Sequence, residues 1–262
     1  MLVIDSSFPA QDFNERNGEP VRQVILHYTA APFASSLHTL TRHGVSAHYL
    51  LPDPDEPGYR TRGYDELRVF RLVDEDKRAW HAGVSYWAGR DNLNSRSIGV
   101  EIVNLARDDA GVFTFPAYGQ AQVEVLVALV RDVLGRYPQI GPTDVLGHSD
   151  VAYWRKSDPG PRLPWRCLHE AGVGAWFDEA TRAMYQRRFC LGLPPEVEVE
   201  RAFQRYGYKA ASNRQAFEQR TRAFQMHFRS RDYCGFLDAE TCAILYALND
   251  RYRGLSEYIS VI

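Results

Sequence analysis

The stretch SIGVEIVN at positions 97–104 decides the fold class. Between Ile98 and Val103 it is apolar on both faces of a strand, and Glu101 is the exception. A strand that is apolar on both faces lies inside a sheet that other elements cover on each side. The segment therefore predicts the central strand of an α/β domain, in which helices flank the two faces of one sheet.

Further elements are expected on either side of this strand. The patterns predict a short helix at 35–42, begun by Ser35 or Ser36, and a longer helix at 120–137. Residues 1–20 read as an irregular arm. The apolar stripe expected on the longer helix consists of Val123, Val127, Val130 and Leu134, widened by Leu126 and Val133. Four more segments have strand-like composition, and they lie at 24–27, 47–51, 69–73 and 145–148.

The C-terminal part of the chain has a different character. The break LGLPP at 191–195 follows an arginine-rich helical segment, and three helical patterns without any strand signal come after it. We therefore predict two units, a larger α/β domain at 1–178 and a small all-α three-helix domain at 195–262. A helix and a linker between 177 and 197 would join them.

Charge and composition exclude several classes of function. The 262 residues carry a net charge of −2, which gives no electrostatic case for nucleic acid. No apolar run approaches the roughly 20 residues of a membrane span. The start MLVIDSSFPAQDF has no basic region and no long apolar core, so no Sec signal is predicted. The four cysteines are expected to be buried thiols, with a Cys234–Cys242 bridge left open.

Two histidines and an aspartate form a candidate metal site. His27 and His148 each stand at the end of a predicted strand, and strand ends in such a sheet converge at one rim. Asp158 follows in a loop rich in glycine and proline that can fold back toward them. Catalytic zinc takes three such protein ligands and keeps one position for water. This predicts a zinc hydrolase, although spacing alone leaves open that the histidines are structural.

Glu101 and Lys156 are the candidate catalytic groups. Burial of Glu101 inside an apolar strand would raise its pKa toward that of a general base. The alternative is a structural carboxylate paired with an arginine. Lys156 lies two residues before Asp158, and in an extended loop the two side chains point the same way. Lys156 could then donate to an oxyanion beside the metal, unless it is simply a solvated lysine.

Five further residues are weaker candidates for contacts with substrate. His48 is expected to be a packed residue near the site rather than a metal ligand. His81 and Trp80, in a loop rich in aromatic residues, are expected to form the wall of the cleft. Arg71 and Asn104 are expected to flank the cleft and to bind carboxylates or amides of the substrate.

Six segments between residues 20 and 175 together form a family pattern: VILHYTA, SAHYLL, RAWHAGVS, SIGVEIVN, GHSDVA and KSDPGPRLPW. With them the chain resembles the zinc-dependent N-acetylmuramoyl-L-alanine amidases of the type-2 amidase family, relatives of peptidoglycan recognition proteins. The resemblance implies a mixed sheet with flanking helices. It also implies zinc held by His27, His148 and Asp158, with Glu101 as the base and Lys156 as the oxyanion stabiliser. The implied reaction is hydrolysis of the amide that joins the lactyl group of N-acetylmuramic acid to L-alanine of the peptidoglycan stem peptide.

The segment RAFQMHF at 222–228 and the residues after it resemble a peptidoglycan-binding three-helix domain. The arrangement is similar to the two-domain, cell-wall-acting branch of the family. It implies action in the periplasm, and without a Sec signal we expect export by a specialised secretion system, as for a secreted effector. A homo-oligomer and an immunity or delivery protein are left open as partners. The alternatives are a catalytically weak peptidoglycan-binding protein and a cytoplasmic amidase that recycles anhydro-muropeptides.

Overall fold

The computed structural model describes residues 2–109 and 112–254. Six strands form one sheet in the order β1-β5-β4-β9-β3-β12. The pair β4–β5 is antiparallel and every other neighbouring pair is parallel, which confirms the predicted mixed sheet. Its strands are β1 (Ile4–Asp5), β3 (Gln23–Tyr28), β4 (Tyr49–Leu51), β5 (Val69–Arg71), β9 (Ser97–Ile102) and β12 (Val145–Gly147).

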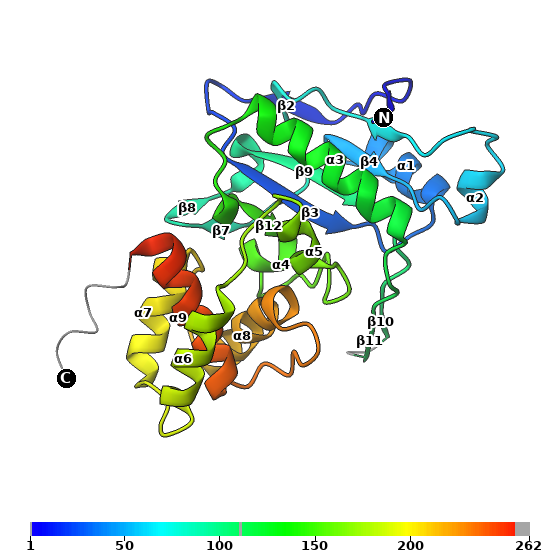
Figure 1. Ribbon diagram of the computed structural model, residues 1–262. Helices are drawn as coiled ribbons and strands as arrows, with labels where there is room; N and C mark the ends of the chain where they lie inside the picture. The colour runs from blue at the N-terminus through cyan, green and yellow to red at the C-terminus, as the bar shows by residue number, and fades with distance from the viewer. Residues whose placement is uncertain (1, 110–111, 255–262) are drawn as a thin grey trace.

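Helices cover both faces of this sheet, as the apolar strands predicted. Figure 1 shows α3 (Gln120–Arg136) lying across one face, where its buried side chains join Leu26 and Val100 in one core cluster. The opposite face carries α1 (Phe33–Arg42), which packs with Leu50 and Phe70. The stripe predicted for α3 is confirmed at Val130, Leu126 and Val133, which are buried. The buried face of α3 also contains Gln122 and Leu129, whereas Val123, Val127 and Leu134 are only partly buried, so the face is rotated from the predicted one.

The C-terminal part contains helices joined by loops and no strand among its described residues. The three predicted patterns are confirmed as α7 (Glu196–Tyr206), α8 (Arg214–Phe228) and α9 (Ala239–Arg253). The preceding helix, α6 (Glu179–Phe189), packs on α9, where Tyr185 and Phe189 make edge-to-face ring contacts with Tyr246. In Figure 1 these four helices, yellow-green to red, form a group beside the sheet. One core cluster runs from Leu146 of β12 into these helices, so the two parts share a hydrophobic contact.

Several local predictions are wrong. Residues 1–20 contain β1 and also β2 (Phe13–Glu15), which pairs with β6 (Lys77–Ala79). Pro32, not Ser35 or Ser36, stands at the N-cap of α1. All four cysteines are free, and only Cys242 is buried. The remaining described helices and strands are α2 (Pro57–Arg60), β7 (Tyr86–Trp87), β8 (Arg90–Asp91), β10 (Arg107–Asp109), β11 (Val112–Thr114), α4 (His148–Val151) and α5 (Trp165–Glu170), with 3-10 turns at 93–96 and 142–144.

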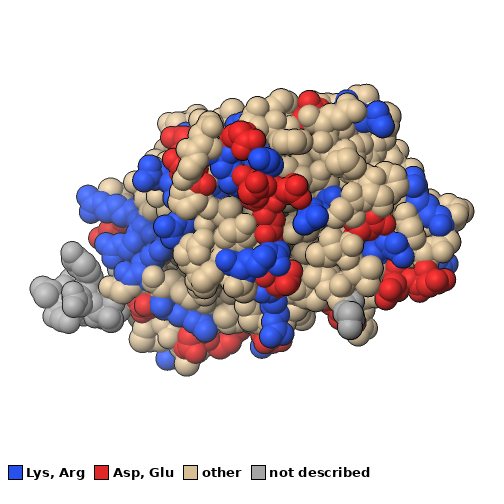
Figure 2. Space-filling view, turned by 90° about the horizontal axis from the view of Figure 1, so that it is seen from above, with Lys and Arg blue, Asp and Glu red and all other residues tan. Residues whose placement is uncertain are grey.

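The surface carries charges of both signs. Acidic and basic side chains lie interspersed on the face shown in Figure 2. Exposed ion pairs such as Arg214–Glu218 and Arg166–Glu170 occur along single helices, where residues four apart are neighbours. No helix within the described residues is both long and apolar enough to cross a membrane.

Candidate metal centre and active site

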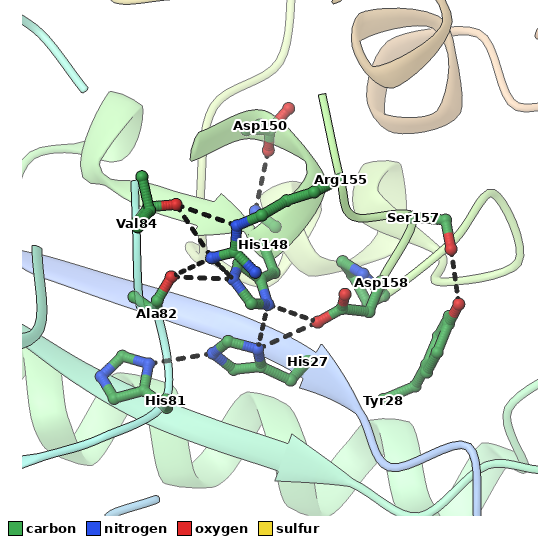
Figure 3. Close-up of polar contacts among 12 residues, drawn as sticks. His27, Tyr28, His81, Ala82, Val84, His148, Asp150, Arg155, Ser157 and Asp158 are labelled. Carbon is green, nitrogen blue, oxygen red and sulfur yellow. Dashed lines mark hydrogen bonds and ion pairs between the residues drawn. The ribbon is translucent and has the colours of Figure 1, made fainter. Parts of the chain in front are cut away.

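Three buried side chains converge where β3 and β12 end (Figure 3). His27 is the last residue but one of β3, and Asp158 lies in the loop that follows α4. His148 is the first residue of α4 rather than the last residue of a strand, because β12 stops at Gly147. The Nδ1 atoms of His27 and His148 are 2.9 Å apart, and Asp158 Oδ2 lies 2.9 Å from the first and 3.0 Å from the second. The structure thus brings together the three residues predicted as ligands.

The donor set suits zinc. Two imidazole nitrogens and one carboxylate oxygen are the ligands of a catalytic zinc site, which keeps a further position open. Donor atoms bound at about 2.0–2.1 Å to one tetrahedral zinc lie roughly 3.3 Å apart, so the observed triangle needs only small shifts to admit the ion. Within the described ranges, this is the group of His, Cys, Asp and Glu side chains close enough to share one ion.

The protonation of these groups also suits a metal. Burial, together with His148, lowers the pKa of His27 to about 4, so His27 is neutral at neutral pH. Burial opposes ionisation of Asp158, but a proton on Nδ1 of the two histidines outweighs it and holds the pKa of this carboxyl well below its usual range. A bound zinc ion would take the place of that proton. Neutral imidazole and ionised carboxylate are the forms that coordinate zinc.

A chain of hydrogen bonds fixes the tautomer of His27. Ser97 Oγ donates to the carbonyl of Leu93 at 2.8 Å, so this oxygen is left to accept from His81 Nε2 at 3.1 Å. His81 Nδ1 then accepts from His27 Nε2 at 3.0 Å. The remaining lone pair of His27 is on Nδ1, which faces the proposed metal position.

His148 is fixed by the backbone on its far side. Its Nε2 donates to the carbonyl of Ala82 at 3.1 Å, which leaves the lone pair on Nδ1. Arg155 donates to the carbonyls of Ala82 and Val84 and so holds this segment in place. The sequence analysis missed Arg155, although it stands next to Lys156 in the loop that carries Asp158.

The ring of His81 needs a glycine beneath it. A Cβ on Gly99 would lie only 2.4 Å from His81 Cγ. We expect Gly99→Ala to displace His81, to break its bond to His27, and to weaken zinc binding by about 10- to 100-fold. Competition titration with a chromophoric chelator measures this. Gly135→Ala, at an open position on α3, is the matched control and should bind zinc like the wild type, whereas equal affinities for both variants would contradict this role of His81.

Glu101 faces the same site. It pairs in register with His27 across the parallel strands β3 and β9, so the two side chains lie on the same face of the sheet. Its Oε2 is buried without a hydrogen-bond partner. Burial, and then the charge of Asp158, raises the pKa of Glu101 well above its ordinary value, while Lys156 opposes this. No arginine pairs with Glu101 within the described residues, which contradicts the alternative of a structural ion pair.

These groups line an open cavity of about 410 Å³, which is large enough for a small ligand. Lys156 is exposed and lies at the wall of this cavity beside Asp158. Trp80 and His81 line it as predicted, and His81 also supports His27 directly. Side chains from α1 close the cavity on the other side.

The other substrate candidates lie elsewhere. Arg71 stands at the end of β5, which runs antiparallel to β4, so it lies at the opposite edge of the sheet in an ion pair with Asp74. The expectation that it flanks the cleft is therefore wrong. Asn104 is also wrong as a cleft residue, because its side-chain amide is buried and donates to the carbonyl of Pro116. His48 is packed as expected, and its Nδ1 accepts from the backbone N–H of Gly99 at 2.9 Å.

His48 makes the stability of the fold depend on pH. Burial, together with Arg16, lowers its pKa to about 3. Because the unfolded value is about 6.5, the unfolded chain takes up the proton first, and stability is lost as the pH falls from about 6.5 toward 3. We expect the free energy of unfolding to depend less on pH in His48→Asn, which keeps an acceptor for the backbone N–H of Gly99. Denaturant unfolding of the metal-free protein across the range measures it. His38→Asn, at an exposed position, is the control, and an unchanged slope in His48→Asn would refute the assignment.

Comparisons with known proteins agree with this site. The family model described as N-acetylmuramoyl-L-alanine amidase matches residues 17–161. The N-acetylmuramoyl-L-alanine amidase AmiD of Escherichia coli is 42% identical over 240 residues, which cover 88% of this chain and 83% of that protein.

Two solved structures extend the similarity to the C-terminal helices. AmpDh3 of Pseudomonas aeruginosa in complex with anhydromuramic pentapeptide is 53% identical, with a TM-score of 0.87 over 96% of this chain and 99% of that one. AmiD of E. coli in complex with anhydro-N-acetylmuramic acid-L-Ala-D-γ-Glu-L-Lys is 38% identical, with a TM-score of 0.78 over 93% and 92%.

Proposed function

The chain belongs to the N-acetylmuramoyl-L-alanine amidase family, and we propose that it carries out the family reaction with a zinc ion held by His27, His148 and Asp158. It hydrolyses the amide between the lactyl group of N-acetylmuramic acid and L-alanine of the stem peptide. The observation that carries the metal assignment is the triangle of three buried donor atoms, each 2.9–3.0 Å from the others.

The remaining chemistry is assigned to groups of this chain. A zinc ion in such a site supplies Lewis-acid polarisation and activates a water molecule. Glu101 accepts a proton from the attacking water as the new C–O bond forms, and returns it to the amine of L-alanine as the C–N bond breaks. Lys156 donates to the oxyanion that develops on the lactyl carbonyl. The raised pKa of Glu101 supports its role, because a carboxyl that holds a proton can also release it to the leaving amine.

Mass spectrometry of peptidoglycan incubated with the purified protein tests this function. Free stem peptides that begin with L-alanine are expected, with their release lost on chelation and restored by zinc. Release that a chelator leaves untouched would contradict the zinc assignment. Release of fragments cut within the stem peptide would contradict the amidase reaction, since a peptidase would produce them.

A second candidate substrate is the soluble anhydro-muropeptide. The two structurally similar amidases contain anhydromuramic peptides, so a ligand of this class is accepted by close relatives. Parallel assays on intact sacculi and on purified anhydro-muropeptides separate the two candidates. Cleavage of the soluble fragments alone would assign the chain to cytoplasmic recycling.

The arrangement of the chain suggests a wall-acting enzyme. In this proposal the catalytic domain spans residues 1–178 and a peptidoglycan-binding three-helix domain spans residues 195–262, of which 1, 110–111 and 255–262 lie outside the described residues. The second domain directs the enzyme to the wall in the periplasm. Export as a secreted effector, with an immunity or delivery partner, belongs to the same proposal. A pull-down with insoluble peptidoglycan tests the binding role, and the absence of retention by the wall would contradict it.

A further inference from the structure

Two side chains from the C-terminal helical part reach the segment that carries His148. Asp150, in α4, accepts at Oδ1 from the hydroxyl of Tyr208 at 2.5 Å. Its Oδ2 lies 2.8 Å from Nδ1 of His227 in α8. All three side chains are buried, with exposures of 1%, 0% and 4% for Asp150, Tyr208 and His227. These hydrogen bonds therefore join the two parts of the chain away from solvent. Loss of one partner would leave a buried polar group without a hydrogen bond, which would destabilise the contact.

The same carboxylate holds the turn that begins α4. Asp150 Oδ2 accepts from the backbone N–H of Gly147 at 2.8 Å, directly before His148 (Figure 3). On the other side of His148, the backbone N–H of Ser149 donates to the carbonyl of Asp158 at 2.8 Å. Gly147 also lies against Pro159, where a Cβ would come within 2.7 Å of Pro159 Cδ. A change at Asp150 would thus be transmitted to both His148 and the loop that carries Asp158.

His227 also contacts the C-terminal end of the loop that carries Asp158. Its ring stacks on Trp165, the first residue of α5, with ring centroids 3.7 Å apart. On the same helix it stacks on Phe228 at 3.9 Å. Helix α8 therefore contacts the chain on both sides of Asp158, at Asp150 before it and at Trp165 after it.

We infer that Asp150 is a positioning residue, through which Tyr208 and His227 of the helical part fix the geometry of the metal ligands. The inference rests on the proposed function, because it requires that His148 and Asp158 bind zinc. It gives the C-terminal helices a role in the metal site that is independent of any binding to the wall. Carboxylates and backbone groups behind metal ligands set metal affinity in other proteins, and here the supporting group itself depends on a distant helix.

A matched pair of tyrosine variants tests the inference. Tyr208→Phe removes only the hydroxyl that donates to Asp150. Tyr153→Phe removes a hydroxyl that donates to the carbonyl of Ala210 at 3.1 Å, across the same contact between the two parts but outside the Asp150 link. We expect the zinc dissociation constant to rise about tenfold in Tyr208→Phe and to stay unchanged in Tyr153→Phe. Competition titration of the full-length chain against a chelator measures both.

Two further measurements separate positioning from general destabilisation. The visible absorption spectrum of the Co²⁺-substituted protein reports ligand geometry, and we expect it to change in Tyr208→Phe and Asp150→Asn but not in Tyr153→Phe. His227→Asn, which keeps a donor near Nδ1, should retain tighter zinc binding than His227→Ala. If Asp150→Asn does not fold, the tyrosine pair still decides the question.

The outcomes distinguish this inference from the proposed function. A wild-type protein that binds no stoichiometric zinc would refute the metal assignment itself. A wild type that binds zinc, with Tyr208→Phe equal to it in affinity and in Co²⁺ spectrum, would overturn the positioning role alone. Equal weakening by Tyr208→Phe and Tyr153→Phe would also overturn it, since the effect would then follow from any lost bond between the two parts.

Discussion

Glu101→Gln is expected to lower kcat by a factor on the order of 10²–10⁴, the range that a general base contributes. Glutamine has the same shape as glutamate but cannot take the proton of the attacking water. Because Oε2 of Glu101 has no hydrogen-bond partner, the change breaks no bond to that atom. Steady-state kinetics on a purified muropeptide, with zinc content measured on the same samples, gives the result. A loss below tenfold at full zinc occupancy would assign Glu101 to structure.

The stability of the same variant provides an independent check, because we expect the substitution to raise stability while it lowers kcat. Burial raises the pKa of Glu101 in the folded chain, so ionisation above the unfolded value of about 4.3 favours unfolding. Metal-free Glu101→Gln is therefore expected to be more stable than the wild type at neutral pH and equally stable in acid. A residue kept only for structure would instead lose stability when replaced. Thermal unfolding at both pH values separates these results.

The position of the active site in the sheet could be predicted because the carboxyl ends of neighbouring parallel strands lie at the same end of the sheet. His27 and Glu101 both lie near the carboxyl ends of apolar strands, and those strands prove to be neighbours in register. The same reasoning failed for Arg71, because nothing in its local pattern reveals that β5 runs antiparallel to β4. Direction in a sheet depends on the path of the whole chain, and a segment of three residues does not encode it.

Other failures have a similar physical origin. The sequence predicts His148 as the last residue of a strand, but β12 ends at Gly147 and α4 begins at His148. Gly147 lies close to Pro159, and its backbone N–H donates to Asp150, which holds the turn at this point. The link from Asp150 to His227 joins residues 77 apart in sequence, and no local pattern predicts it. The proposed metal ligands and catalytic groups could be predicted because only a few residue types can bind zinc or transfer a proton. The residues that hold them in place can be of many types, and their roles follow from contacts that only the folded structure shows.

Lys156→Met is expected to lower kcat by roughly 10²- to 10³-fold, as for the loss of one oxyanion donor, with little change in KM. Methionine keeps most of the length of the side chain at the cavity wall and removes only the donating ammonium group. Lys77→Met, at an exposed ion pair with Glu15 outside the cavity, is the control and should leave kcat unchanged. A raised KM with unchanged kcat would instead assign Lys156 to holding the substrate.

The pH profile of Lys156→Met carries a second signature. The positive charge of Lys156 lowers the pKa of Glu101 and so opposes the larger effect of burial. Removal of that charge is expected to raise the pKa of Glu101 further. Since the base must be ionised to accept a proton, the acid limb of kcat/KM should move to higher pH in the variant. An acid limb at the wild-type position would contradict the coupling between Lys156 and Glu101, even if kcat fell as expected.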